Sequence, residues 1–164
     1  MLIRIVCPYD SFWPAEASSL AGRIAGYLTN LGAKIEHIGS TAVPGLEAKP
    51  VLDLLIGLSN RHEIDEAIRR LSSAWWQDFG DAGVAGRRYM RNRRSIASNL
   101  HIVLIDKEHW VNNLALRDYL RSHPAEVTKY AAAKRAAVNA GHRRLLTYSA
   151  AKAETIAELM VKSL

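Results

Sequence analysis

One feature constrains this chain more than any other: a Gly-Ser-Thr turn followed by an acid inside an apolar segment. The small side chains of Gly39-Ser40-Thr41 let backbone N–H groups approach a ligand, and two hydroxyls add donors suited to phosphate. Asp53 lies in the apolar run 51–58, where an isolated carboxylate must be paired, hydrogen-bonded or bound to a metal. If neighbouring strands bring the turn and Asp53 together, they form a site. The alternative is a tight turn and a carboxylate that caps a backbone group.

Composition sets the class of protein. The chain has 164 residues, a length typical of one domain spanning 1–164. Its single cysteine, Cys7, excludes an internal disulfide and a cysteine-ligated zinc site. No apolar run is long enough to span a bilayer and no signal peptide is apparent, so we expect a cytoplasmic protein without membrane partners. An excess of 22 basic over 16 acidic residues gives a net charge of +6, which indicates affinity for anions without choosing among them.

Hydrophobic periodicity places the predicted elements along the chain. Apolar residues at helical spacing predict a helix from Pro14 to about 31, and Asn60 with Glu63 predicts the capped start of another. Strands are predicted at 34–38, 51–58, 75–79, 87–91 and 99–105, and helices from 107 onward, from Pro124 and over 150–161, with Gly141 in the last gap. The strands concentrate in the middle and helices occupy both ends. This order predicts an α+β fold with a mixed sheet.

Several segments resemble the GrpB family, a group placed in the nucleotidyltransferase superfamily. The similarity is carried by residues 37–53, by 114–121, by Pro124, Tyr130, Lys134, Tyr148 and Lys152, and by the opening Pro8-Tyr9-Asp10 with Trp13-Pro14. The resemblance covers nearly the whole chain. It implies the polymerase-beta-like nucleotidyltransferase fold, a central mixed sheet flanked by helices with a helical C-terminal part. In active members of that superfamily a Gly-Ser turn holds triphosphate, an Asp-x-Asp or Asp-x-Glu pair binds two magnesium ions, and a later strand adds a third carboxylate.

This sequence departs from that pattern at the second acid. Gly39, Ser40 and Asp53 match, but position 55 is Leu55. Two close cations need bridging carboxylates, so one aspartate could hold only a single hydrated Mg²⁺ through substrate phosphates.

A histidine is the candidate for the place of the third carboxylate. His101 is the ionisable residue of the later strand, although a lone strand histidine is more often part of the core. We therefore predict His37, Asp53 and His101 as ligands of Mg²⁺ or another divalent metal, and Asp53 and His101 as catalytic residues.

Basic residues supply further phosphate candidates. A strip of five arginines spans 87–94, in which Arg91 shares a strand face with Tyr89 and is the phosphate candidate. The alternative is an edge strand blunted by charge. Lys49 precedes Pro50, whose ring favours an extended conformation that would hold the Lys49 amine over the site.

On a later helix, Arg117 and Arg121 are candidate phosphate ligands, with Asp118 to orient them. The alternative is an ion network that locks the helix to the sheet, which we favour for Asp118. The four tryptophans are scattered along the chain, and we assign them no ligand.

Three functions follow, in order. The first is a nucleotidyltransferase-like protein that binds a nucleotide or a phosphorylated small molecule and depends on a divalent metal. The second is a non-catalytic module with the same ligands, linked to coenzyme A metabolism because some family members are fused to a dephospho-coenzyme A kinase domain. The third is RNA binding through Arg87, Arg88, Arg91, Arg93 and Arg94. It ranks last and we expect no nucleic-acid partner, because the net charge is modest and no recognised RNA module is present.

Overall fold

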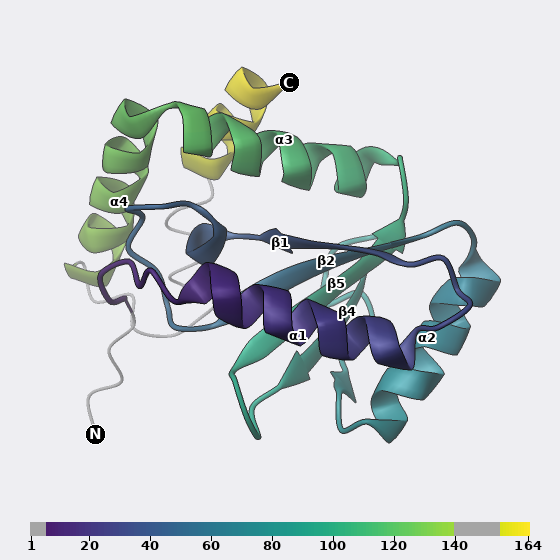
Figure 1. Ribbon diagram of the computed structural model, residues 1–164. Coiled ribbons are helices and arrows are strands. Elements are labelled where there is room, and N and C mark those ends of the chain that lie inside the picture. The colour runs from purple at the N-terminus through teal and green to yellow at the C-terminus, as the bar shows by residue number, and fades with distance from the viewer. Residues whose placement is uncertain (1–5, 140–154) are drawn as a thin grey trace.

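A five-stranded mixed sheet forms the centre of the protein. The computed structural model describes residues 6–139 and 155–164 (Figure 1). Its strands are β1 (Lys34–Ile38), β2 (Leu52–Leu58), β3 (Gln77–Asp78), β4 (Arg88–Asn92) and β5 (Ser98–Leu104), in the order β1-β2-β5-β4-β3. β2 and β5 are parallel, and the other neighbouring pairs are antiparallel. The predicted α+β class and mixed sheet are confirmed.

Helices cover both faces of the sheet. Figure 1 shows α1 (Trp13–Tyr27) and α2 (Arg61–Ser73) on one side and α3 (Glu108–Ser122) on the other. The short helix η1 (Ser40–Ala42) follows β1, α4 (Pro124–Asn139) follows α3, and residues 155–163 are helical. Gly141, Tyr148, Lys152 and the start of the predicted last helix lie outside the described residues. No helix in the described ranges combines the length and apolar character that crossing a membrane requires.

Strand β2 is buried on both faces, as its continuous apolar run predicts. Leu52, Leu54, Ile56 and Leu58 belong to the main core with α1 and α2, and the opposite face carries Leu55. A third cluster joins α3, α4 and the loop at 43–46. A slip of one residue would turn the Asp53 side chain toward the main core, which disfavours any other register of this strand.

Close packing at Gly57 sets where α3 crosses the sheet. A Cβ atom at Gly57 would lie 2.7 Å from two ring carbons of Trp110, which stands near the start of α3. The indole therefore rests directly on the backbone of β2. Asp53, near the other end of β2, has a side chain that remains 25% exposed, and that end of the sheet holds the candidate site.

Candidate functional site

The end of β1 and the start of β2 meet at one corner of the sheet. Ile38 is the register partner of Asp53, so the turn at Gly39 lies beside that carboxylate. Gly39 has a φ of 75°, and a Cβ atom there would lie 2.9 Å from Asp53 Oδ2. Only glycine combines this backbone conformation with so close an approach. The predicted meeting of the turn with Asp53 is present in the structure.

Two donors on β5 hold the Asp53 carboxylate. Asn99 Nδ2 donates to Asp53 Oδ1 at 2.9 Å, and His101 Nε2 lies 2.9 Å from the same oxygen. The register places Asn99 beside Asp53 and His101 beside Leu55, so these side chains share one face. These contacts explain how an acid is tolerated in an apolar strand. His101 is therefore a partner of the acid, with a side chain that is 18% exposed.

His37 lies on the opposite face of the sheet. It is the register partner of Leu54, a main-core residue, whereas Asp53 is opposite Ile38. Its Nε2 atom lies 2.8 Å from the hydroxyl oxygen of the buried Thr41. Burial, reinforced by the charge of Arg121, lowers the pKa of His37 to about 4, so the ring is neutral near pH 7.

The predicted set of three metal ligands is consequently not assembled. Within the described residues, no three His, Cys, Asp or Glu side chains are grouped so that they could hold a metal ion. The reason is the alternation of side chains along β1, which separates His37 from Asp53 and His101. Leu55, fully buried, stands where a second acid would be needed. The site therefore does not fit a pair of magnesium ions.

A buried lysine from α4 reaches the turn. Lys134 is 2% exposed, and its ammonium donates to the hydroxyl of Ser40 and to the backbone carbonyl of Glu47, the latter at 2.8 Å. The same amine lies 4.8 Å from the centre of the Tyr130 ring. A cation is thus fixed against the serine of the Gly-Ser turn.

Lys134 is not among the site residues predicted from the sequence, although its helical spacing from buried residues of α4 indicates a buried position. The apolar residues Val127, Tyr130 and Ala131 are buried in the cluster formed with α3. Lys134 follows Val127 by seven residues and Tyr130 by four, which places it in the same helical stripe. A lysine in an otherwise apolar stripe needs a polar partner.

The charge of Asp53 acts on the amine of Lys49. Burial lowers the pKa of Lys49, and the negative charge of Asp53 opposes that shift. A role for Lys49 in binding phosphate stays a prediction.

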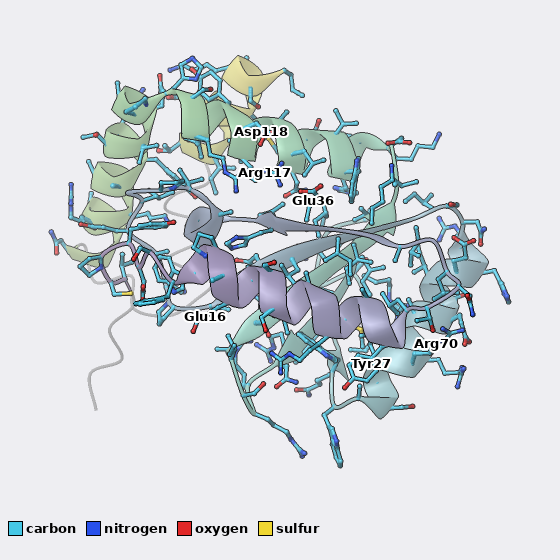
Figure 2. The ribbon with its side chains drawn as sticks, in the orientation of Figure 1. Glu16, Tyr27, Glu36, Arg70, Arg117 and Asp118 are labelled. Atoms are coloured by element: carbon cyan, nitrogen blue, oxygen red, sulfur yellow. The ribbon has the colours of Figure 1, made fainter. Side chains whose placement is uncertain are left out.

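Arg117 and Arg121 hold α3 against the corner. Figure 2 shows Arg117 reaching from α3 toward Glu36 of β1, with Asp118 beside it. Arg117 Nη1 donates to Glu36 Oε2 at 2.7 Å, and Nε donates to Asp118 Oδ1 at 2.8 Å. Arg121 Nε donates to the carbonyl of Ala42 in η1 at 2.8 Å. These contacts are those of the ion network, and a role for either arginine in binding phosphate stays a prediction.

The arginine strip lies on β4 and its flanking loops, on the side of Asp53 that faces away from β1. Arg91 pairs in register with Asn99 and packs its guanidinium 3.8 Å from the centre of the Phe79 ring. Arg93 donates to Asn99 Oδ1 at 2.9 Å, which links it through Asn99 to Asp53. Arg91, the candidate named from sequence, thus shares the face of Asp53, while Arg93 has the more direct connection.

Solved structures with the same fold include a close and a distant group. The crystal structure of the conserved protein GrpB from Enterococcus faecalis aligns with a TM-score of 0.83 at 30% identity, over 96% of this chain and 98% of that one. The Cid1 poly(U) polymerase bound to MgGTP aligns with a TM-score of 0.53 at 12% identity, over 76% of this chain and 42% of that one. The second likeness shows the polymerase-beta-like nucleotidyltransferase fold alone.

Curated relatives cover most of the chain. A UPF0157 protein of Streptomyces coelicolor is 30% identical over 94% of this chain and 80% of its own length, and one of Pseudomonas aeruginosa is 28% identical over 97% and 67%. A dephospho-CoA kinase of Mycolicibacterium paratuberculosis is 33% identical over 44% of this chain and 18% of its own length. The profile of the GrpB protein family matches residues 3–162. The chain belongs to the GrpB protein family.

Proposed function

We propose that this protein binds a nucleotide or another phosphorylated small molecule at the corner formed by Gly39, Ser40 and Asp53. The observation that carries the proposal is the Gly-Ser turn lying against the Asp53 carboxylate with the Lys134 ammonium on Ser40. Lysine amines at such a turn offset the charge of a phosphate, and the small turn residues allow backbone N–H groups to approach it. The fold shared with Cid1, which has been solved with MgGTP bound, supports a nucleotide as the ligand.

Nucleotidyl transfer at this corner is the second candidate, favoured by the pair of His101 and Asp53. An imidazole held by a carboxylate and partly open to solvent is positioned to accept a proton from an attacking hydroxyl. Leu55 favours binding without transfer, because it removes the carboxylate that a second metal ion would need. We therefore propose that any metal requirement is met by a single cation, bound between Asp53 and the phosphates of the ligand.

A thermal-shift screen tests the binding proposal. The ligands are ATP, GTP, CTP, UTP and coenzyme A precursors, the last included because of the dephospho-CoA kinase relative, each with and without Mg²⁺ or Mn²⁺. A ligand at about 100 times its Kd stabilises a protein by roughly 2.7 kcal/mol, or several degrees at this size. We expect such a shift in the wild type and its loss in Asp53→Asn and Ser40→Ala. The absence of a shift with every ligand contradicts the proposal.

Binding and transfer are separated by His101→Gln. This variant should keep the thermal shift and lose metal-dependent turnover if His101 accepts the proton. Binding without turnover in the wild type identifies a non-catalytic module.

A further inference from the structure

One of the four tryptophans is exposed at the surface. Trp13, Trp76 and Trp110 are only 4%, 5% and 7% exposed, whereas Trp75 is 67% exposed. An exposed indole does not contribute the hydrophobic stabilisation that the three buried tryptophans provide. Its exposure therefore has no explanation in core packing.

The backbone at Trp75 is also unfavourable for a tryptophan. Trp75 follows the last turn of α2 with a φ of 70°. Its N–H donates to the carbonyl of Ser72 at 3.3 Å, and the N–H of Trp76 donates to that of Leu71 at 3.0 Å, which closes the helix in a Schellman motif. Glycine is the residue that normally takes this left-handed position, and a bulky residue there is strained. Helix termination alone therefore does not account for the tryptophan.

Arginines surround the exposed ring. The Arg94 guanidinium lies 4.1 Å from the centre of the Trp75 ring, and together with Arg91 and Arg93 these residues line a pocket of about 390 Å³ beside Trp76. Figure 1 shows the end of α2, which Trp75 follows, and the loop between β4 and β5, which carries Arg93 and Arg94, on the lower side of the sheet. Arg91 belongs to β4. Within the described ranges, none of these three arginines forms an ion pair with a carboxylate: Arg91 and Arg94 stack on aromatic rings, and Arg93 donates to the carbonyls of Asn92 and Ser98.

We propose that Trp75, Arg91, Arg93 and Arg94, here called the Trp75 surface, bind a single-stranded polynucleotide, the class of partner that the sequence alone ranked last. An exposed indole provides a platform on which an unpaired base stacks, and guanidinium groups donate to the phosphates on either side of it. A duplex keeps its bases stacked on each other, so the ring selects single strands.

Hydrogen bonds link the Trp75 surface to the Gly39 corner. Arg93 bonds to Asn99, and Asn99 bonds to Asp53, so hydrogen bonds connect the pocket to the Gly39 corner. From β3 to β2 the sheet crosses three strand spacings, roughly 14 Å at about 4.8 Å each. A polynucleotide bound at Trp75 would therefore need more than one nucleotide to reach that corner. The inference goes beyond the proposed function and does not depend on it, because its test uses no nucleoside triphosphate.

Binding is measured with a fluorescein-labelled, short single-stranded oligouridylate. We expect anisotropy to show binding that weakens with salt, with a slope of log Kobs against log salt of about −2 for three arginines. Intrinsic fluorescence should be quenched by an unlabelled strand, because Trp75 is the tryptophan that a base can reach. An oligodeoxyuridylate in parallel distinguishes RNA from DNA as the source of the strand, and binding of either supports the proposal.

Matched variants separate the surface from general charge and stability. Trp75→Gly should weaken binding about tenfold or more and abolish the quenching, with an unchanged or higher Tm because glycine relieves the backbone. Trp75→Phe should retain most of the affinity. Arg94→Ala should weaken binding and reduce the salt slope by about 0.7. Arg69→Ala removes the same charge from an exposed ion pair with Glu66 on α2 and should change nothing.

Several results overturn the proposal. These are no binding at low salt, equal binding by Trp75→Gly, or equal binding of a duplex. Quenching by uridine monophosphate as strong as by the oligonucleotide would identify a mononucleotide pocket instead. Competition by polyglutamate as effective as by RNA would identify an acidic protein as the partner.

Discussion

At the scale of single residues, the corner depends on the absence of a side chain at Gly39. Asp53 occupies the space where a Cβ atom of Gly39 would stand, and the positive φ of that residue adds a second restriction. The two effects are separable in this chain. Gly45 also has a positive φ but has nothing within 4 Å of its Cβ position, and Gly22 lies in α1 with the same open space and no positive φ.

The three alanine variants should consequently rank in stability. Gly39→Ala should lose about 2–4 kcal/mol in the free energy of unfolding, because strain and the contact with Asp53 add. Gly45→Ala should lose about 1–2 kcal/mol from strain alone, and Gly22→Ala should gain about 0.5–1 kcal/mol. Urea denaturation measures all three. Equal losses at Gly39 and Gly45 would show that the Asp53 contact costs nothing.

His37 gives the protein a defined response to acid. Its pKa is about 4 in the folded state and 6.5 in its ordinary state, so the unfolded chain takes up the proton first as pH falls. The free energy of unfolding should therefore fall between pH 6.5 and 4 and stay level above that window. The loss should be about 1–2 kcal/mol, because solvent still reaches part of the ring.

The glutamine variant isolates this contribution. In His37→Gln, an amide can still bond to Thr41 but cannot titrate, so its stability should fall less over the same window. Parallel curves for the wild type and the variant, measured by thermal unfolding against pH, would contradict the assignment.

At the scale of elements, Arg117 links α3 to β1 through the Glu36 carboxylate and the His37 carbonyl. Arg117 is 11% exposed and bonds to Glu36, to Asp118 and to the carbonyl of His37. Removing it leaves the carbonyl of His37 without that donor, while water can reach the Glu36 carboxylate, which is 41% exposed. We expect Arg117→Ala to lower the free energy of unfolding by about 1–2 kcal/mol, because hydrogen bonds to a charged donor are lost at a junction that water partly reaches.

An exposed ion pair provides the comparison for Arg117. Arg69→Ala breaks the pair with Glu66, in which Arg69 is 68% exposed, and should cost less than about 1 kcal/mol. Chemical denaturation of both variants decides the point. A loss at Arg117 no larger than that at Arg69 would mean that α3 is held by its apolar contacts alone.

Elements were more predictable from the sequence than side-chain groupings. The apolar run of β2 and the capping residue Asn60 predicted a strand and a helix start that the structure contains, because both depend on local pattern. The predicted strand at 75–79 is reduced to β3, because Trp75 and Trp76 complete the end of α2 instead.

Local sequence pattern could not show whether His37, Asp53 and His101 lie close enough together to bind one metal ion. Whether two strands place residues on the same face depends on their register, and β1 pairs so that Ile38 and not His37 faces the side of Asp53. The position of Lys134 depended on the packing of α4 against the turn, ninety-four residues away in sequence. The corner between Gly39 and Asp53 was predictable because Gly39 follows the end of β1 and Asp53 lies near the start of the neighbouring strand β2.

At the scale of the whole molecule, the corner is where the sheet meets α4. Lys134 of α4 places its ammonium against the hydroxyl of Ser40. Arg121 of α3 donates to the carbonyl of Ala42 in η1, next to that serine. A ligand at the turn would therefore stabilise the contact between these parts of the chain.

The replacement Lys134→Met tests that connection. Methionine keeps the length and apolar stem of the side chain while it removes the charge and the bonds to Ser40 and Glu47. We expect the variant to remain folded and to bind any ligand of the wild type about tenfold more weakly, as measured by titration calorimetry, because loss of one charge-assisted bond is worth about 1.5–3 kcal/mol. Unchanged affinity would remove Lys134 from the site.

Hydrogen–deuterium exchange with and without the four ribonucleoside triphosphates and Mg²⁺ tests the central claim most directly, because it locates a ligand on the chain. The account predicts slower amide exchange at residues 39–46 and around Asp53 and Asn99, with α2 unchanged as an internal reference. Unaltered exchange at residues 39–46, or slowing confined to other segments, would contradict a phosphate-binding site at the Gly39 corner.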